Sequence, residues 1–224
     1  MAPRTLTAHL FVISVLLMSG CGGGGGGSAT PAPQQNLQSA RAPSQPMTVS
    51  ATTLTATDNS GNTYTATYSS TPGGMTVFNG HNANTSLVSL TVSRNGTVVS
   101  TEDSTAYYLL NPYTPLGLSG MTNDIAWTAY VTSFTPFPST LTVGSSGPVL
   151  SANYQVDGAN VGGLTETYTV TADSPTALSL NINAAGSISG TQVAETLTFS
   201  VTSAGAAGLV EAQVTVNGTT LTFH

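Results

Sequence analysis

The chain has 224 residues, of which only 5% are charged, and it contains no lysine. Soluble domains have about 25% charged residues, so uncharged polar groups must cover most of the surface of this protein. Residues 47–224 hold one basic residue, Arg94, together with all nine acidic residues. This balance argues against nucleic-acid binding, because contacts to phosphates require clustered Lys and Arg.

Residues 1–20 have the pattern of a secretory signal peptide. Arg4 supplies the positive charge near the start, and residues 10–18 form an apolar run of nine residues, LFVISVLLM. This run is too short for a membrane span, which needs about 20 residues. We therefore expect an exported protein whose first segment serves as a targeting signal.

The apolar run ends in the sequence LMSGC, at Cys21. This ending resembles the lipobox of bacterial lipoproteins, in which the cysteine becomes an acylated N-terminus carrying palmitate or a related chain. Methionine replaces the leucine that is commoner three residues before the cysteine. The resemblance implies that Cys21 is the lipidation site and that the protein reaches the membrane through this lipid. Stable anchoring requires more than one acyl chain, which lipoprotein maturation supplies.

Residues 21–46 begin with Cys21 and six glycines, and continue with Pro, Ser, Ala and Gln. Such a composition is typical of a flexible tether. A cysteine followed by polyglycine is similar to uncharacterised proteobacterial outer-membrane lipoproteins, in which glycine after the cysteine implies release to the outer membrane. The resemblance implies an outer-membrane location, facing the periplasm or the cell surface, and no activity.

Residues 47–224 show apolar residues at every second position, as in Tyr64-Ala66-Tyr68, Leu178-Leu180-Ile182 and Leu197-Phe199-Val201. Residues two apart share a face in a strand but not in a helix, so this spacing predicts strands. Asn95-Gly96, Asp157-Gly158 and Asn217-Gly218 predict tight hairpin turns. We expect an all-β domain, an antiparallel β-sandwich or barrel of roughly ten to twelve strands, or alternatively two tandem immunoglobulin-like sandwiches.

The sequence offers little for catalysis. His81 is the only histidine within the expected domain apart from the last residue, and it lies in a turn-like Asn-Gly-His-Asn segment. Most of the nine carboxylates are expected in turns or at outward positions of strands, so no acid/base pair is predicted. The scattered histidines and the single cysteine argue against a transition-metal site, and Asp58-Asn59-Ser60-Gly61-Asn62 reads as an ordinary turn. We expect no enzymatic activity, no cofactor and no metal.

The segment 107–137 is rich in aromatic residues and proline. Aromatic rings are common in binding clefts, so this segment is the best candidate for a ligand site. The candidate residues are Tyr107, Tyr108, Tyr113, Trp127 and Tyr130. The alternation places Trp127 and Tyr130 on opposite faces of one strand. We expect a lipid-anchored envelope protein with a binding, display or structural role toward a protein or a glycan. The alternative is a carrier that holds a small apolar or sugar ligand in its interior.

Overall fold

The computed structural model describes residues 36–43 and 51–224. Strands dominate it, and none of the described segments forms a long apolar helix of the kind that crosses a membrane. The signal segment, Cys21 and the glycine run lie outside the described residues. The prediction of an all-β fold is confirmed.

Twelve of the strands form one antiparallel sheet in which almost every strand pairs with its neighbours in the chain. The order is β14-β13-β12-β11-β10-β9-β7-β6-β5-β4-β3-β2. Because one sheet contains all twelve, the alternative of two tandem immunoglobulin-like sandwiches is wrong. The bounds are β2 (Thr52–Thr57), β3 (Thr63–Phe78), β4 (His81–Arg94), β5 (Thr97–Leu110), β6 (Tyr113–Thr122), β7 (Ile125–Phe134), β9 (Ser146–Val156), β10 (Ala159–Ala172), β11 (Ala177–Ile188), β12 (Thr191–Thr202), β13 (Ala207–Val216) and β14 (Thr219–Phe223).

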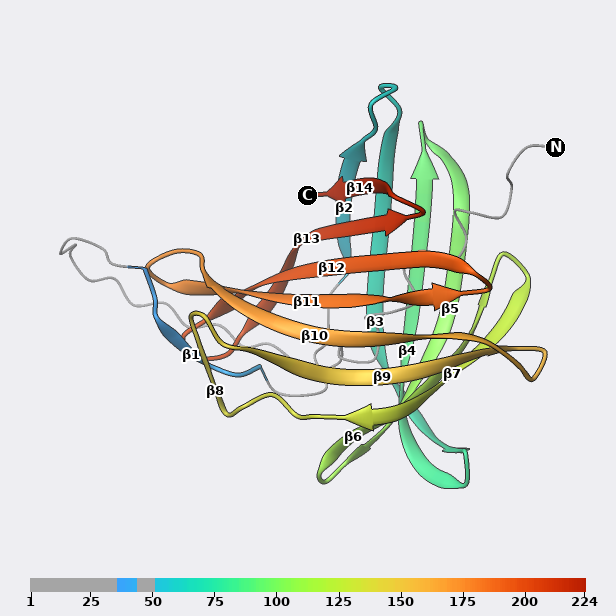
Figure 1. Ribbon diagram of the computed structural model, residues 1–224, viewed down its shortest axis with the longest axis horizontal. Helices are drawn as coiled ribbons and strands as arrows, with labels where there is room; N and C mark the ends of the chain where they lie inside the picture. Colours follow the sequence, from blue (N-terminus) through green and yellow to red (C-terminus); the bar gives the residue numbers. More distant parts are fainter. Residues whose placement is uncertain (1–35, 44–50) are drawn as a thin grey trace.

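The sheet curls over on itself into a nearly closed barrel. In Figure 1, strands β3 to β5 run across the direction of β9 to β12, so the two halves of the sheet form two crossing layers around the core. Its ends meet at a seam, where Thr55 of β2 and His224, just after β14, exchange two backbone hydrogen bonds of 2.9 Å each. Closure of this kind protects sheet edges that would otherwise be free to pair with other chains.

The hairpin turns form where the sequence predicts them. Asn95, Asp157 and Asn217 all have positive φ angles, between 47° and 51°, and each is followed by a glycine with φ between 76° and 80°. This pair of left-handed residues is the type I′ turn, whose twist matches that of the adjoining strands. Asn79-Gly80 and Ser189-Gly190 form turns of the same kind.

The apolar residues of the alternating pattern face inward. Leu197, Phe199 and Val201 are all at most 5% exposed, as the sequence predicts for one face of a strand. Their outward neighbours are mostly threonine and serine, whose hydroxyl groups hydrogen-bond to water, and threonine also has the β-branched shape that strands favour. The inward faces of both layers meet in a single hydrophobic core.

A small second sheet covers one end of the core. It pairs β1 (Ser39–Arg41) with β8 (Thr140–Thr142) in antiparallel register, and it buries Ala40 and Leu141. Strand β1 lies within the segment 21–46, which the sequence predicts to be a flexible tether. The described part of that segment is therefore packed on the barrel, and packed residues begin before Met47.

Candidate functional site

The structure divides the five aromatic candidates between the two faces of the sheet. Tyr108 and Trp127 are buried and face inward, and Tyr113 packs against Tyr108 with ring centroids 5.6 Å apart. Tyr107 and Tyr130 lie on the outer face. Trp127 and Tyr130 thus point to opposite sides of β7, as the alternation predicts, and the five residues do not form one aromatic surface.

The two outward tyrosines belong to a small aromatic stack on the outside of the sheet. The ring of Phe78, at the end of β3, lies 4.1 Å from that of Tyr107 and 5.6 Å from that of Tyr130, centroid to centroid. Gly117 makes room for this stack, because a Cβ there would lie 2.8 Å from the Phe78 ring and would also clash with the backbone oxygen of Ala129. Phe78 lies outside the segment 107–137, so composition of that segment alone does not identify it.

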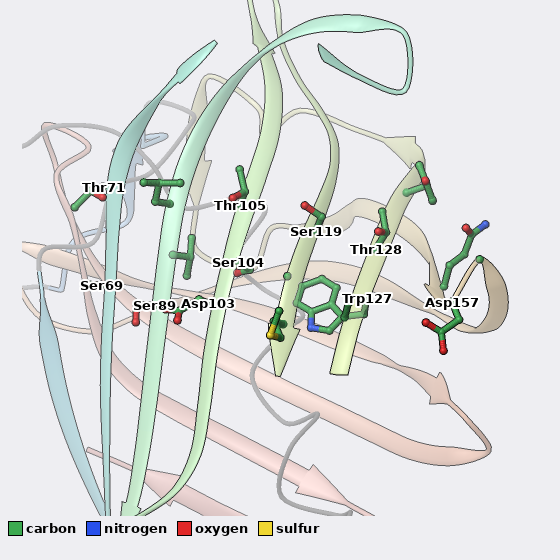
Figure 2. A pocket seen from close by; sticks show the side chains of 18 residues that line it. Ser69, Thr71, Ser89, Asp103, Ser104, Thr105, Ser119, Trp127, Thr128 and Asp157 are labelled. Atoms are coloured by element: carbon green, nitrogen blue, oxygen red, sulfur yellow. The ribbon is translucent and has the colours of Figure 1, made fainter. Parts of the chain in front are cut away.

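A groove of about 940 Å³ lies beside this stack. Figure 2 shows side chains from the adjacent strands β3 to β7, and Asp157 from the turn after β9, around the hollow. The lining is dominated by hydroxyl groups, those of Ser69, Thr71, Ser89, Thr105, Ser119 and Thr128, and it also includes Ser104, whose own hydroxyl is buried. Strand pairing accounts for part of this grouping, since Ser69, Ser89 and Asp103 are direct neighbours in register across β3, β4 and β5.

The remaining lining residues determine which ligands fit the groove. Asp103 and Asp157 supply carboxylates, Gln155 supplies an amide, and none of the lining residues is basic. Leu87 and Met121 add exposed apolar surface, being 52% and 50% exposed. The groove therefore offers hydrogen-bond donors and acceptors, some apolar contact and negative charge. These properties suit a neutral or cationic ligand and disfavour an anionic one.

Trp127 forms part of the inner wall of the groove. It is only 5% exposed, yet it contributes to the lining, and its indole lies against Gly120 of β6. A Cβ at Gly120 would lie 2.6 Å from Cζ2 of the indole, so glycine is required where the ring lies this close to the strand. The indole Nε1–H donates a hydrogen bond of 2.9 Å to Thr122 Oγ1, which in turn donates one of 3.2 Å to Glu102 Oε2.

Glu102 belongs to a cluster of three buried glutamates in the barrel interior. Glu102, Glu166 and Glu195 are 4%, 1% and 3% exposed. In the register of the sheet, Glu166 of β10 is opposite Ala184 of β11, which is opposite Glu195 of β12. Glu102 is on β5, in the other half of the sheet, and interacts electrostatically with Glu195. Tyr68 and Tyr154 interact with the same carboxyls from β3 and β9.

The cluster is acidic throughout. Burial raises the pKa of Glu102 to about 8, and the negative charge of Glu195 adds to this effect while the Thr122 hydrogen bond opposes it. Burial, assisted by Glu195, holds the pKa of Glu166 well above its usual range. Both carboxyl oxygens of Glu166 and the hydroxyl oxygen of Ser104 have no hydrogen-bond partner. Burial therefore keeps Glu102 and Glu166 in the protonated form at neutral pH.

This cluster is not among the sites expected from the sequence, because most of the carboxylates were expected in turns and at outward positions of strands. The signal was nevertheless present in the spacing. Glu166 is in phase with the inward Leu164 and Tyr168, and Glu195 is in phase with Val193 and Leu197. A glutamate in phase with the buried residues of a strand predicts a buried carboxyl.

The other candidate residues have ordinary surroundings. The Asp58 carboxylate accepts hydrogen bonds from the backbone of Ser60 and from Asn62 and Tyr64, and the Asn62 side chain contributes most to lowering the pKa of Asp58. Its turn is thus held by its own side chains, as predicted for an ordinary hairpin. His81 is exposed. Across residues 36–43 and 51–224, no group of three or more His, Cys, Asp or Glu side chains is placed to hold a metal ion.

Comparison with known proteins returns no matching family model, no similar curated protein and no similar solved structure.

Proposed function

We propose that this protein is a non-enzymatic, lipid-anchored envelope protein that binds a neutral, hydroxyl-rich ligand such as a glycan segment in the outer groove. The observation that carries this proposal is the lining of the groove, in which hydroxyl groups from five neighbouring strands surround two carboxylates and an amide. The lipid at Cys21 holds the barrel at the outer membrane. The sequence pattern around Cys21 supports the proposed location, and the groove supports the proposed binding role.

The chemistry of the lining favours a sugar over other ligands. Sugars present many hydroxyl groups, each able to donate and accept, and Asp103, Gln155 and Asp157 offer matching partners at fixed positions. Leu87, Met121 and Tyr130 supply the apolar contacts that the C–H faces of sugar rings need. The absence of basic side chains from the lining disfavours phosphorylated or sulfated ligands, whose charge Asp103 and Asp157 would repel.

The placement of the carboxyls supports a binding role rather than catalysis. A general acid at neutral pH requires a raised pKa and access to the substrate. Burial raises the pKa of Glu102 and of Glu166, but these side chains are at most 4% exposed and face the interior. The interior carrier considered from the sequence is not favoured either, because Trp127 and Tyr154 pack against each other there, with centroids 5.9 Å apart.

The proposal is tested by calorimetric titration of the folded domain with three kinds of probe. These are neutral oligosaccharides of the bacterial envelope and capsule, the sulfated form of one of them, and the polyamine spermidine. Binding of a neutral oligosaccharide, with at least tenfold weaker binding of its sulfated form, supports the proposal. Binding of spermidine alone, or preference for the sulfated form, contradicts it.

A pair of variants assigns the binding to the groove. Ser89→Trp places a large ring in the lining from an exposed position of β4 and should abolish binding. Thr171→Trp makes the same kind of change at an exposed position of β10 outside the groove and should leave binding unchanged. Equal affinity in both variants would show that the ligand binds elsewhere.

A further inference from the structure

Three residues connect the outer groove to the interior carboxyl cluster. Trp127 lines the groove, its Nε1–H donates to Thr122, and Thr122 donates to Glu102 in the interior. Thr122 is fully buried, and its hydroxyl is the acceptor for the indole and the donor for the carboxyl at once. The hydroxyl gives its single proton to Glu102 and keeps its oxygen free to accept from the indole, so the three side chains form one continuous chain of hydrogen bonds.

The groups around Glu102 give its negative charge no compensation. Glu195 faces it from β12, Asp103 adjoins it on β5, and Tyr68 and Tyr154 face it from β3 and β9. All of these groups are acidic. In the part of the chain that the structure describes, the basic side chains are all exposed: Arg41, Arg94, His81 and His224. An ionised Glu102 therefore has no positive partner in the interior, and solvation by water is the remaining way to stabilise it.

The wall between Glu102 and the groove is thin at one place. Ser104 lies two residues beyond Glu102 on β5, lines the groove, and has a hydroxyl oxygen without a hydrogen-bond partner. Gly120 is opposite Ser104 in register, and the Trp127 indole and the Ser104 Cβ fill the space that a side chain at Gly120 would need. If the indole moves away from Gly120, water that enters there meets the unpartnered Ser104 hydroxyl first and the Glu102 carboxyl next.

We propose that Glu102 is a positioning residue for Trp127 whose effect depends on its proton. While the carboxyl is protonated, the indole stays in the groove wall. Loss of this proton to solvent admits water, moves the indole and weakens ligand binding. The expected change in ligand affinity rests on the proposed function of the groove. The expected movement of Trp127 is independent of that function. The midpoint should lie near pH 8, because burial and Glu195 raise the pKa of Glu102 to about that value.

The first test uses Trp127 fluorescence without any ligand. Trp127 is the only tryptophan, so the emission reports on this wall alone. Between pH 6 and pH 9 the emission should shift to longer wavelength and become accessible to acrylamide, with one midpoint near pH 8. Glu102→Gln keeps an oxygen that accepts from Thr122 but has no proton to lose, so this shift should disappear. Asp124→Asn, at an exposed turn, is the matched control and should behave as the wild type does.

A second variant separates this mechanism from a general loosening of the barrel. Glu195→Gln removes the charge that raises the pKa of Glu102, so the midpoint of the Trp127 shift should move to lower pH. A shift that persists in Glu102→Gln, or a wild-type emission that is constant from pH 6 to pH 9, would overturn the proposal. Circular dichroism at each pH verifies that the barrel remains folded, so that unfolding is not mistaken for movement of the indole.

The second test measures the affinity of the protein for the oligosaccharide that binds most tightly in the calorimetric titration. Wild-type affinity should fall at least about fivefold between pH 6 and pH 9, the lower end of usual coupling between sites. The affinity of Glu102→Gln should stay constant. If no oligosaccharide binds but the Trp127 shift follows Glu102, the proposed function fails and the proton-controlled movement stands. If binding occurs with the same pH dependence in Glu102→Gln, the link between Glu102 and the groove is wrong.

Discussion

Glu166 and Glu195 lie on the same interior row of the sheet, on either side of Ala184. Alternate strands of a sheet are about 10 Å apart, and the methyl group of Ala184 between them is too short to separate two glutamate side chains. The two carboxyls interact electrostatically, which raises the pKa of Glu166 further than burial alone. The row thus concentrates acidic groups at the centre of a core that is otherwise largely apolar.

The first prediction concerns how stability depends on pH. In the unfolded chain these glutamates ionise near pH 4.5, whereas in the folded protein Glu102 ionises only near pH 8. The contribution of Glu102 to the free energy of unfolding is therefore greatest below about pH 4.5. It decreases as the pH rises and is lost once the pH has passed about 8. Each such group lowers the free energy of unfolding by about 1.4 kcal/mol per pH unit within its window. Urea unfolding at pH 5, 7 and 9 measures this trend.

Glu166→Gln supplies the comparison for that experiment. The amide cannot ionise, so the variant should be more stable than the wild type at pH 9 and should show a flatter dependence on pH. Asp124→Asn changes an exposed carboxylate, and its free energy of unfolding should depend on pH in the same way as that of the wild type. A wild-type protein that is as stable at pH 9 as at pH 5 would contradict the raised pKa values of Glu102 and Glu166.

The second prediction concerns the two faces of β12. Phe199 is 1% exposed, and Phe199→Ala should lower the free energy of unfolding by about 3–5 kcal/mol. Thr198 points outward and donates a hydrogen bond of 2.9 Å to the side chain of Asn181 at a partly exposed position. Thr198→Ala should cost less than about 1 kcal/mol. Equal losses at the two positions in denaturant unfolding would contradict the assignment of the faces.

The third prediction concerns the glycine beneath the outer aromatic stack. A Cβ at Gly117 would clash with the backbone oxygen of Ala129 and with the Phe78 ring. Gly117→Ala should therefore destabilise the protein by about 1–3 kcal/mol through overpacking. Gly208→Ala is the matched control, because a Cβ at Gly208 meets nothing within 4 Å. Thermal unfolding of the two variants measures the difference, and equal melting temperatures would be evidence against close packing at Gly117.

The fourth prediction concerns the proposed lipid anchor. Cys21→Ser removes the thiol that would be acylated, and it should release the protein from the membrane fraction into the soluble fraction. Fractionation after a salt wash, followed by mass spectrometry of the N-terminal peptide, measures both location and acylation. Retention of the Cys21→Ser protein in the outer membrane would show that another feature attaches it.

The sequence predicts the strands and turns well because their causes are local. Alternation fixes which side of a strand is apolar, and Asn217-Gly218 reaches the left-handed conformation that a two-residue turn needs. Local pattern does not reveal whether the sheet splits into two sandwiches or curls into one barrel. That choice depends on the accumulated twist and on the contact between Thr55 and His224, which are far apart in the chain.

The groove and the cluster were harder to foresee, for different physical reasons. The groove is formed by outward serines and threonines that look like ordinary surface residues, and only the curvature of β3 to β7 brings them around one hollow. The cluster becomes visible in the sequence only when the position of each glutamate is compared with the buried residues of its strand. Glu195, for example, shares the spacing of Val193 and Leu197. Its members meet only because the two halves of the sheet face each other.

The Thr55–His224 seam also bears on how the chain reaches this structure. Almost all other strand pairs join neighbours in the chain, which form quickly because little loop entropy is lost. The seam joins the first and last strands of the sheet, and it is the contact with the greatest loop-closure cost. We therefore expect a folding intermediate to be an open, curved meander with its edges unpaired, and the two backbone hydrogen bonds at Thr55 to form last.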